Sequence, residues 1–216
     1  MSPRPFERPA TIALPETRGL PIGAALDGLW LPSRGADGER GGAVVAAPHP
    51  LMGGAMDSPV TTEIGLALCD LGFVSLRFNW RGVGASAGIA SGEADDADTD
   101  YRAALAFMQE SVEGPIIGCG YSWGAVTAVR VCLEVPRVQK LVLIAPPPAM
   151  LEGSTLASCG KALLVIVGDQ DQYAPVDALR EVLDGCDRTE LIVLKDADHF
   201  FMAGLAEIGR GIRNWF

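Results

Sequence analysis

The sequence predicts a single α/β domain built on a doubly wound, mostly parallel sheet with an antiparallel start. From Gly42 onward, short apolar segments alternate with longer helical ones, the order typical of parallel strands joined by crossover helices. Segments such as 163–167 (Leu-Leu-Val-Ile-Val) are apolar throughout, as strands covered on both faces must be. The 216 residues, 49% hydrophobic and 20% charged, suit one globular unit, so we assign residues 1–216 to one domain.

The expected elements follow one another along the chain. Two extended segments, near 11–14 and 22–31, are separated by turn residues and form the antiparallel start. The strands expected after them are 43–47, 74–80, 115–119, 140–145, 162–168 and 191–194. The helices expected between and after these strands are 60–71, 95–110, 123–133, 175–183 and 201–215.

The connection between the strands ending at Ala145 and beginning near Ala162 is short. It holds only about 16 residues, rich in proline and small side chains. A lid domain needs a longer insertion than this. We therefore expect no lid and a fairly open active site.

Composition and charge exclude several classes of protein. A formal charge of −10 without a basic stripe argues against a nucleic-acid partner. Residues 1–9 lack the apolar core of a secretory signal, and no apolar run approaches the roughly 18 residues of a membrane span. The five cysteines have no Cys-x-x-Cys spacing and mostly lie in apolar patterns, which favours buried reduced thiols. We expect a cytoplasmic protein with no membrane partner, and the sequence specifies no oligomeric state.

The pentapeptide Gly-x-Ser-x-Gly occurs twice, around Ser86 and around Ser122. This pattern marks a nucleophile only where a strand runs into the turn and a helix leaves it. Ser122 has that context, between the strand at 115–119 and the helix that begins near Trp123. Ser86 has neither neighbour, since its strand ends near Trp80 and a loop follows. The pattern therefore predicts Ser122 as the nucleophile and a flexible connection around Ser86.

A serine hydroxyl needs a base, and histidine is the usual one at neutral pH. His199 lies in the loop after the last expected strand, where a base is required. The carboxylate that orients it is expected after the preceding strand, where Asp169 and Asp171 compete. The order Ser122, Asp171, His199 is the order of triads in this architecture.

An oxyanion hole must present backbone N–H groups to the substrate carbonyl. One donor is expected from Trp123, the residue after the nucleophile, and the other from the loop after the strand 43–47. Pro50 has no N–H, so Leu51 is the expected second donor. His49 would then shape this loop instead of acting as the base, or contact the substrate.

Five stretches together resemble the small, lidless bacterial α/β-hydrolases related to dienelactone hydrolases. They are Pro-His-Pro-Leu-Met-Gly-Gly-Ala-Met-Asp (48–57), Leu-Arg-Phe-Asn-Trp-Arg-Gly-Val-Gly (76–84), Gly-Tyr-Ser-Trp-Gly (120–124), Gly-Asp-Gln-Asp (168–171) and Ala-Asp-His-Phe-Phe (197–201). The resemblance implies an α/β-hydrolase fold, with Asp171 as the triad acid, the 76–84 stretch as a structural strand and loop, and hydrolysis of a carboxylic ester. Dienelactone hydrolase uses a cysteine nucleophile, and Ser122 at this position argues against that particular activity.

The reaction predicted from these residues is ester cleavage on a small molecule by a Ser-His-Asp triad, with no cofactor and no metal. Apolar side chains beside the motifs are candidates for the substrate pocket: Met52, Tyr121, Trp123, Tyr173 and Phe200. Peptide or thioester cleavage or peracid formation on the same triad is an alternative, as is a non-catalytic binding protein of the same fold. The acidic run 93–100 lacks the glycine and closing glutamate of a calcium loop, so it is assigned to the start of a helix.

Overall fold

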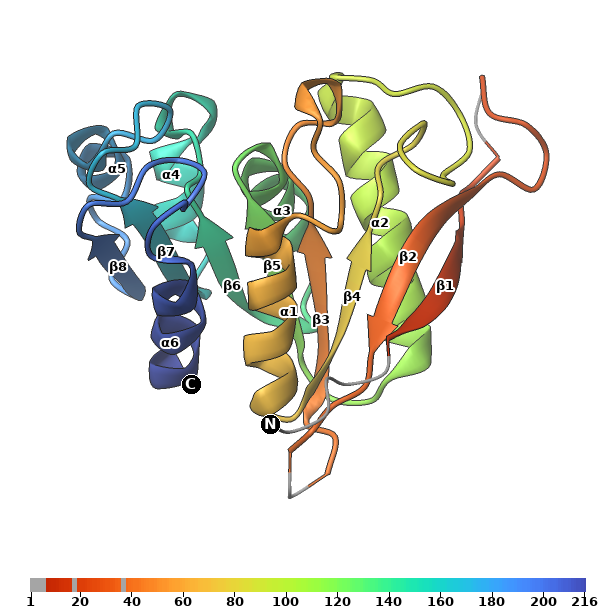
Figure 1. Cartoon of the computed structure of the whole chain (residues 1–216), viewed down its shortest axis with the longest axis horizontal. Helices are drawn as coiled ribbons and strands as arrows, with labels where there is room; N and C mark the ends of the chain where they lie inside the picture. The colour runs from red at the N-terminus through yellow and green to blue at the C-terminus, as the bar shows by residue number, and fades with distance from the viewer. Residues whose placement is uncertain (1–6, 17–18, 36–37) are drawn as a thin grey trace.

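One continuous eight-stranded sheet runs through the molecule in the order β1-β2-β4-β3-β5-β6-β7-β8 (Figure 1). The structure is a computed structural model, which describes residues 7–16, 19–35 and 38–216. The eight strands are β1 (Arg8–Ala13), β2 (Ala25–Leu31), β3 (Gly41–Ala46), β4 (Phe73–Phe78), β5 (Ile116–Tyr121), β6 (Val138–Ile144), β7 (Ala162–Gly168) and β8 (Thr189–Leu194). Strand β2 pairs antiparallel with both β1 and β4, and all other neighbours are parallel. The prediction of a mostly parallel sheet with an antiparallel start is confirmed.

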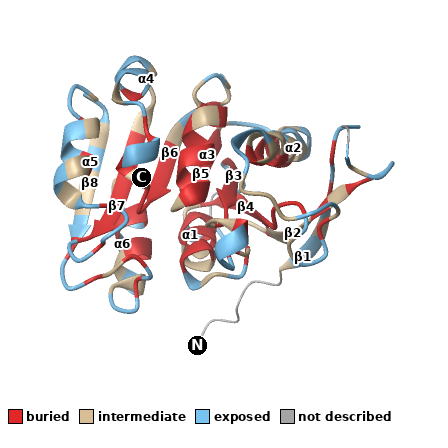
Figure 2. Ribbon diagram, turned by 90° about the horizontal axis from the view of Figure 1, so that it is seen from above, coloured by how far each residue is buried: buried red, intermediate tan, exposed pale blue. Residues whose placement is uncertain are grey.

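Helices cover both faces of the sheet, as the apolar strands require. Helices α1 (Pro59–Asp70) and α6 (Leu205–Trp215) lie on one face, and α2 (Ala94–Ser111) and α3 (Trp123–Cys132) on the other (Figure 2). Every residue of β3, β4 and β5 is buried, so the core lies along the middle of the sheet. The parallel strands all end at one edge, which is where ligands bind in such sheets.

Three short elements are absent from the prediction. They are the one-turn 3₁₀ helices η1 (Pro50–Met52) and η2 (Pro148–Met150), and the short helix α4 (Gly153–Ser158). Both 3₁₀ turns begin at a proline, whose fixed φ suits a first helical position. Helix α4 lies in the connection between β6 and β7, and neither it nor η2 makes a lid. The helix α5 (Val176–Val182) then precedes β8.

Helix α6 begins four residues later than the sequence indicates. Phe201 and Gly204 both adopt positive φ, at 52° and 91°, so the chain turns before the helix starts. Positive φ is costly for a non-glycine residue, and a hydrophobic pattern carries no sign of it. The expected start at residue 201 is therefore wrong, while the helix itself is present.

The cysteines fall into two groups. Cys69, Cys119 and Cys132 are buried, and burial raises the pKa of each thiol, that of Cys132 to about 12. Cys159 and Cys186 are only half-buried, which differs from the expectation of buried thiols.

Within the described ranges, no helix is long and apolar enough to cross a bilayer. The expectation that residues 1–9 hold no secretory signal falls largely on residues 1–6, which lie outside the described residues.

Candidate active site

Ser122 stands on a sharp turn between β5 and α3. Its backbone has φ 55° and ψ −122°, a sparsely populated conformation that neighbouring bonds must hold in place. Its N–H donates to the carbonyl oxygen of Ile144 (2.8 Å), and its own carbonyl oxygen accepts from the N–H of Ala125 (2.9 Å). Strand β6 and the first turn of α3 therefore fix the serine from both sides.

The two glycines around Ser122 are required by close backbone approach. A Cβ on Gly120 would lie 2.2 Å from the carbonyl oxygen of Gly124, and a Cβ on Gly124 would lie 2.3 Å from that of Ala47. No real Cβ contact is this short, and the obstructing atoms are backbone. The pentapeptide around Ser122 thus reflects packing of the turn against β3.

His199 reaches Ser122 from the loop that follows β8. Its Nε2 lies 3.0 Å from the Oγ of Ser122, within hydrogen-bond distance. The hydroxyl of Tyr121 donates to the carbonyl oxygen of His199 (2.8 Å), and Asp196 and Phe201 turn the loop with positive φ. Residues that are 77 positions apart in sequence are thereby brought together at the carboxyl edge of the sheet.

Asp171 completes the row of three side chains. Its Oδ2 lies 2.7 Å from the Nδ1 of His199, and its Oδ1 accepts from the N–H groups of Tyr173 and Ala174, both at 2.8 Å. The Asp171 side chain is fully buried, whereas Asp169 is exposed. The structure therefore brings Asp171, and not Asp169, against the imidazole.

The two expected oxyanion donors differ in their present hydrogen bonds. No acceptor in the described part of the chain takes the N–H of Trp123, which opens α3. The N–H of Leu51 donates to the Nδ1 of His49 (3.2 Å), which caps η1. Leu51 therefore lies in the loop where the sequence places it, but its N–H already has a partner.

His49 sits beside this donor as a neutral acceptor. Burial lowers its pKa, because desolvation disfavours the charged imidazolium. Its ring packs on that of Trp123, with centroids 4.9 Å apart. A Cβ on Gly92 would lie 3.0 Å from both the Cε1 and the Nε2 of His49, so the loop 82–92 packs closely on its other side. His49 therefore helps to hold the loop after β3, and no hydrogen bond joins it to Ser122 among the described residues.

Trp80 and Asn79 also hold this loop, and no role for either is evident from the sequence alone. The Nε1–H of Trp80 lies 3.1 and 3.0 Å from the carbonyl oxygens of Ala47 and Pro48. The Oδ1 of Asn79 accepts from the N–H of Met56 (2.9 Å). The only sequence signal for them is their place in the 76–84 stretch.

Ser86 occupies a different environment. Its Oγ accepts from the N–H of Asp27 and donates to the carbonyl oxygen of Asn79, both at 2.9 Å, and the residue is buried. These bonds tie the loop to the antiparallel start of the sheet. Ser86 is therefore a structural serine in a fixed connection, and the expectation of a flexible one is wrong.

The acidic run at the start of α2 binds two arginines. Asp100, with 1% of its side chain exposed, pairs with Arg81 (2.8 Å), which also pairs with Asp96. Asp98 pairs with Arg130 of α3 (2.7 Å). The acids do lie at the helix start, but they form tertiary ion pairs that the sequence does not reveal.

Among the described residues, no three His, Cys, Asp or Glu side chains come together as a metal site would need.

The candidate substrate-contacting residues divide by exposure. Met52, Tyr173 and Phe200 are exposed by 82%, 58% and 62%, and the Tyr173 ring lies 4.8 Å from that of His199. Tyr121 is buried, and its hydroxyl bonds the His199 loop. The expectation that Tyr121 lines the pocket therefore gives way to a positioning role.

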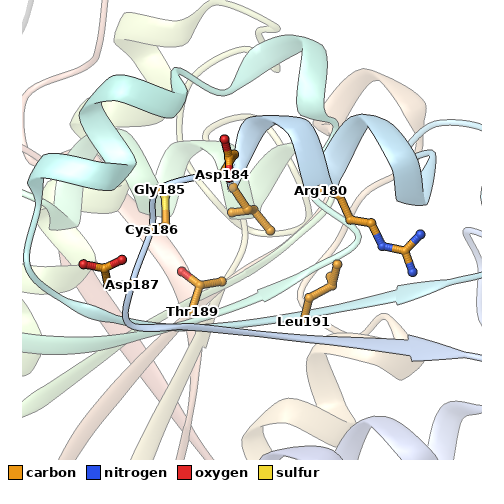
Figure 3. A pocket seen from close by; sticks show the side chains of 8 residues that line it. Arg180, Asp184, Gly185, Cys186, Asp187, Thr189 and Leu191 are labelled. Carbon is orange, nitrogen blue, oxygen red and sulfur yellow. The ribbon is translucent and has the colours of Figure 1, made fainter.

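A separate hollow of about 310 Å³ lies away from these residues (Figure 3). Thr189 and Leu191 of β8 form its floor below the end of α5, which carries Arg180. Thr189 is the first residue of β8, whereas His199 follows the carboxyl end of that strand. The hollow therefore lies toward the amino-terminal ends of the strands, away from His199. None of the residues assigned to the candidate active site lines it.

Comparison with known proteins agrees with this geometry. Residues 43–155 match the family model described as serine aminopeptidase, S33. The uncharacterized protein RP471 of Rickettsia prowazekii (strain Madrid E) is 28% identical over 185 residues, which cover 80% of this chain and 77% of that protein.

Two solved bacterial structures are similar over almost their whole length. An alpha-beta serine hydrolase homologue from Coxiella burnetii is 26% identical, with a TM-score of 0.82 over 97% of both chains. XC6422 from Xanthomonas campestris, described as an a/b serine hydrolase without lid, is 29% identical, with a TM-score of 0.77 over 96% of this chain and 95% of that one. The expected likeness to lidless bacterial α/β-hydrolases is confirmed, and the narrower relation to dienelactone hydrolases stays a prediction.

Proposed function

We propose that this chain, which belongs to the serine aminopeptidase S33 family of hydrolases, cleaves carboxylic esters through an acyl-enzyme intermediate. The main observation that supports this proposal is the unbroken row of contacts from Asp171 through His199 to Ser122, at 2.7 and 3.0 Å. A hydroxyl, an imidazole and a buried carboxylate in this order form the arrangement that turns serine into a nucleophile. We assign the catalytic roles to these three residues.

The first half of the reaction acylates the enzyme. The Oγ of Ser122 attacks the ester carbonyl carbon while the Nε2 of His199 takes the hydroxyl proton. Asp171 holds the Nδ1–H of the imidazole and stabilises its charged form. The tetrahedral intermediate then expels the alkoxide, which takes the proton from Nε2 and leaves as the alcohol. A water molecule, deprotonated by the same nitrogen, then attacks the acyl-enzyme; the second tetrahedral intermediate collapses to the acid and expels the Oγ of Ser122, which takes the proton back from Nε2.

The N–H groups of Trp123 and Leu51 are proposed to bind the oxyanion. Each such donor is commonly worth about 3–4 kcal/mol in the transition state. The N–H of Trp123 is free to donate in the present geometry. The N–H of Leu51 must break its hydrogen bond to the Nδ1 of His49 before it can donate to the oxyanion. The charged oxygen is the stronger acceptor, which favours this exchange.

Ester cleavage is favoured over peptide cleavage by the surroundings of the triad. The rim residues Met52, Tyr173 and Phe200 are exposed and uncharged, and the connection after β6 is too short to close over a substrate. The leaving group of a peptide is an amine, which is a poorer leaving group than an alcohol and depends more on protonation by the histidine. We therefore place a small-molecule ester above the peptidase, thioesterase and perhydrolase alternatives, and we propose a single-domain cytoplasmic enzyme.

A pair of serine variants tests the proposal. Ser122→Ala should abolish hydrolysis of p-nitrophenyl acetate and labelling by a fluorophosphonate probe. Ser86→Ala removes two buried hydrogen bonds and should cost about 1–3 kcal/mol of stability. The Ser86→Ala molecules that are folded, as measured by fluorophosphonate labelling at 20 °C, should keep near-normal activity. Loss of activity in folded Ser86→Ala with retention in Ser122→Ala would overturn the assignment, and an unlabelled wild type would favour a binding protein.

A further inference from the structure

An apolar groove opens beside Tyr173, on the β7 side of the triad. One wall comes from η2 and the start of α4, with Pro148 and Ala149, and the other from Tyr173 and α5, with Ala178 and Val182. Its volume is about 530 Å³. This lies within the ~300–1,000 Å³ that is usual for small-molecule sites.

Tyr173 lies between the groove and the candidate active site and contacts both. The Tyr173 ring forms part of the groove wall and also packs 4.8 Å from the ring of His199. The Tyr173 N–H donates to Asp171, so the same residue is tied to the triad by its backbone. A molecule bound in the groove would therefore be separated from the imidazole by the Tyr173 side chain.

Position relative to the imidazole distinguishes the two halves of an ester. The alcohol oxygen must approach the Nε2 of His199, because that nitrogen returns the proton to the leaving group. The oxyanion donors Trp123 and Leu51 lie on the other side of Ser122, toward β3, in the sheet order β3-β5-β6-β7-β8. A groove that begins at Tyr173, whose ring packs on His199 on the β7 side, is thus on the leaving-group side.

We propose that this groove binds the apolar alcohol moiety of the substrate and so sets its specificity for the leaving group. The inference rests on the proposed ester hydrolysis. Proline, alanine, valine and tyrosine side chains favour a hydrocarbon chain or ring by burial of apolar surface. Glu181 is the charged residue of the lining, and the chain carries a formal charge of −10, so an anionic alcohol is disfavoured.

Isomeric esters test which half of the substrate occupies the groove. Hexyl acetate and ethyl hexanoate have the same formula and nearly the same hydrophobicity, but carry the long chain on opposite sides of the ester, as a hexyl group on the alcohol oxygen or a pentyl group on the carbonyl carbon. Ethyl acetate is the short reference for both. Hydrolysis is followed by titration of the released acid. In the wild type, kcat/KM should rise by about two- to fourfold per methylene from ethyl to hexyl acetate.

Filling the groove should remove part of this gain selectively. Ala178→Trp should lower kcat/KM for hexyl acetate by about tenfold, and leave ethyl acetate and ethyl hexanoate within about twofold of wild type. Ala157→Trp, the same change at an exposed position of α4 outside the groove, should leave all three esters unchanged. Thermal unfolding and the rate of fluorophosphonate labelling report whether each variant is folded, and Ala178→Leu replaces the tryptophan variant if it does not fold.

The outcomes separate this inference from the proposed function. A selective loss on ethyl hexanoate would place the acyl chain in the groove and overturn the proposal. Equal losses on all three esters, or no loss on hexyl acetate, would overturn it as well. If the wild type hydrolyses none of the esters and is not labelled, the proposed ester hydrolysis fails instead.

Discussion

Replacing Asp171 by asparagine isolates the role of its charge. In the structure, Oδ1 accepts two N–H groups from the loop, and Oδ2 faces the Nδ1 of His199. Asparagine can keep its oxygen on the two N–H groups, which leaves its NH₂ group facing Nδ1. Since NH₂ only donates, the imidazole must place its proton on Nε2, pointing at Ser122. The histidine then has no lone pair with which to take the hydroxyl proton.

The size of the effect follows from this change of tautomer. We expect kcat for p-nitrophenyl acetate to fall by about 10⁴-fold, the scale set by the wrong tautomer in Ser-His-Asp enzymes. Stability should fall by only about 1–2 kcal/mol, because the packing and the two loop hydrogen bonds remain. Stopped assays and urea denaturation measure the two quantities. Asp169→Asn, an exposed neighbour, is the control and should retain activity. An Asp171→Asn variant within tenfold of wild type would refute the reasoning.

Two further predictions concern groups that support the site. His49→Phe keeps a ring against Trp123 but removes the acceptor of the Leu51 N–H, so kcat should rise by about two- to tenfold, the worth of one neutral hydrogen bond; a tenfold fall would contradict this. Arg81→Met leaves Asp100 buried without its partner and should cost about 3–5 kcal/mol at pH 7 in urea denaturation. Burial raises the pKa of Asp100 and Arg81 lowers it, so Asp100 of the variant takes up a proton at higher pH than in the wild type and the deficit should shrink from pH 7 to pH 5; a deficit that grows would contradict it.

The parts of the fold that the sequence predicts are those with a local cause. Strand β7 coincides with the expected 162–168, because an uninterrupted apolar run bounded by a glycine has few other interpretations. The turn at Ser122 is predictable for the same reason. A strand that is followed almost directly by a helix leaves room only for a sharp turn between them. The order of the strands then brings three loops to one edge.

Features that depend on distant partners are not predictable from one chain. The pairing of Arg81 with Asp100 crosses from a loop to a helix, and the pattern of acids alone reads as helix capping. The burial of Tyr121 follows from a bond to the carbonyl of His199, 78 residues away. The groove beside Tyr173 likewise forms only when α5 and η2 come together.

The loop after β3 shows how an assignment made from position alone can misjudge an energy. Position predicts Leu51 as a donor, but its N–H is already bound to His49 at 3.2 Å. Breaking that bond costs about 0.5–1.5 kcal/mol, which must be subtracted from the roughly 3–4 kcal/mol that an oxyanion donor supplies. The N–H of Trp123 has no such competitor within the described residues, so it should contribute more to the transition state than the N–H of Leu51. The proposed oxyanion site is thus asymmetric: the N–H of Trp123 at the strained turn has no partner among the described residues, whereas the N–H of Leu51 in the loop after β3 is bound to His49.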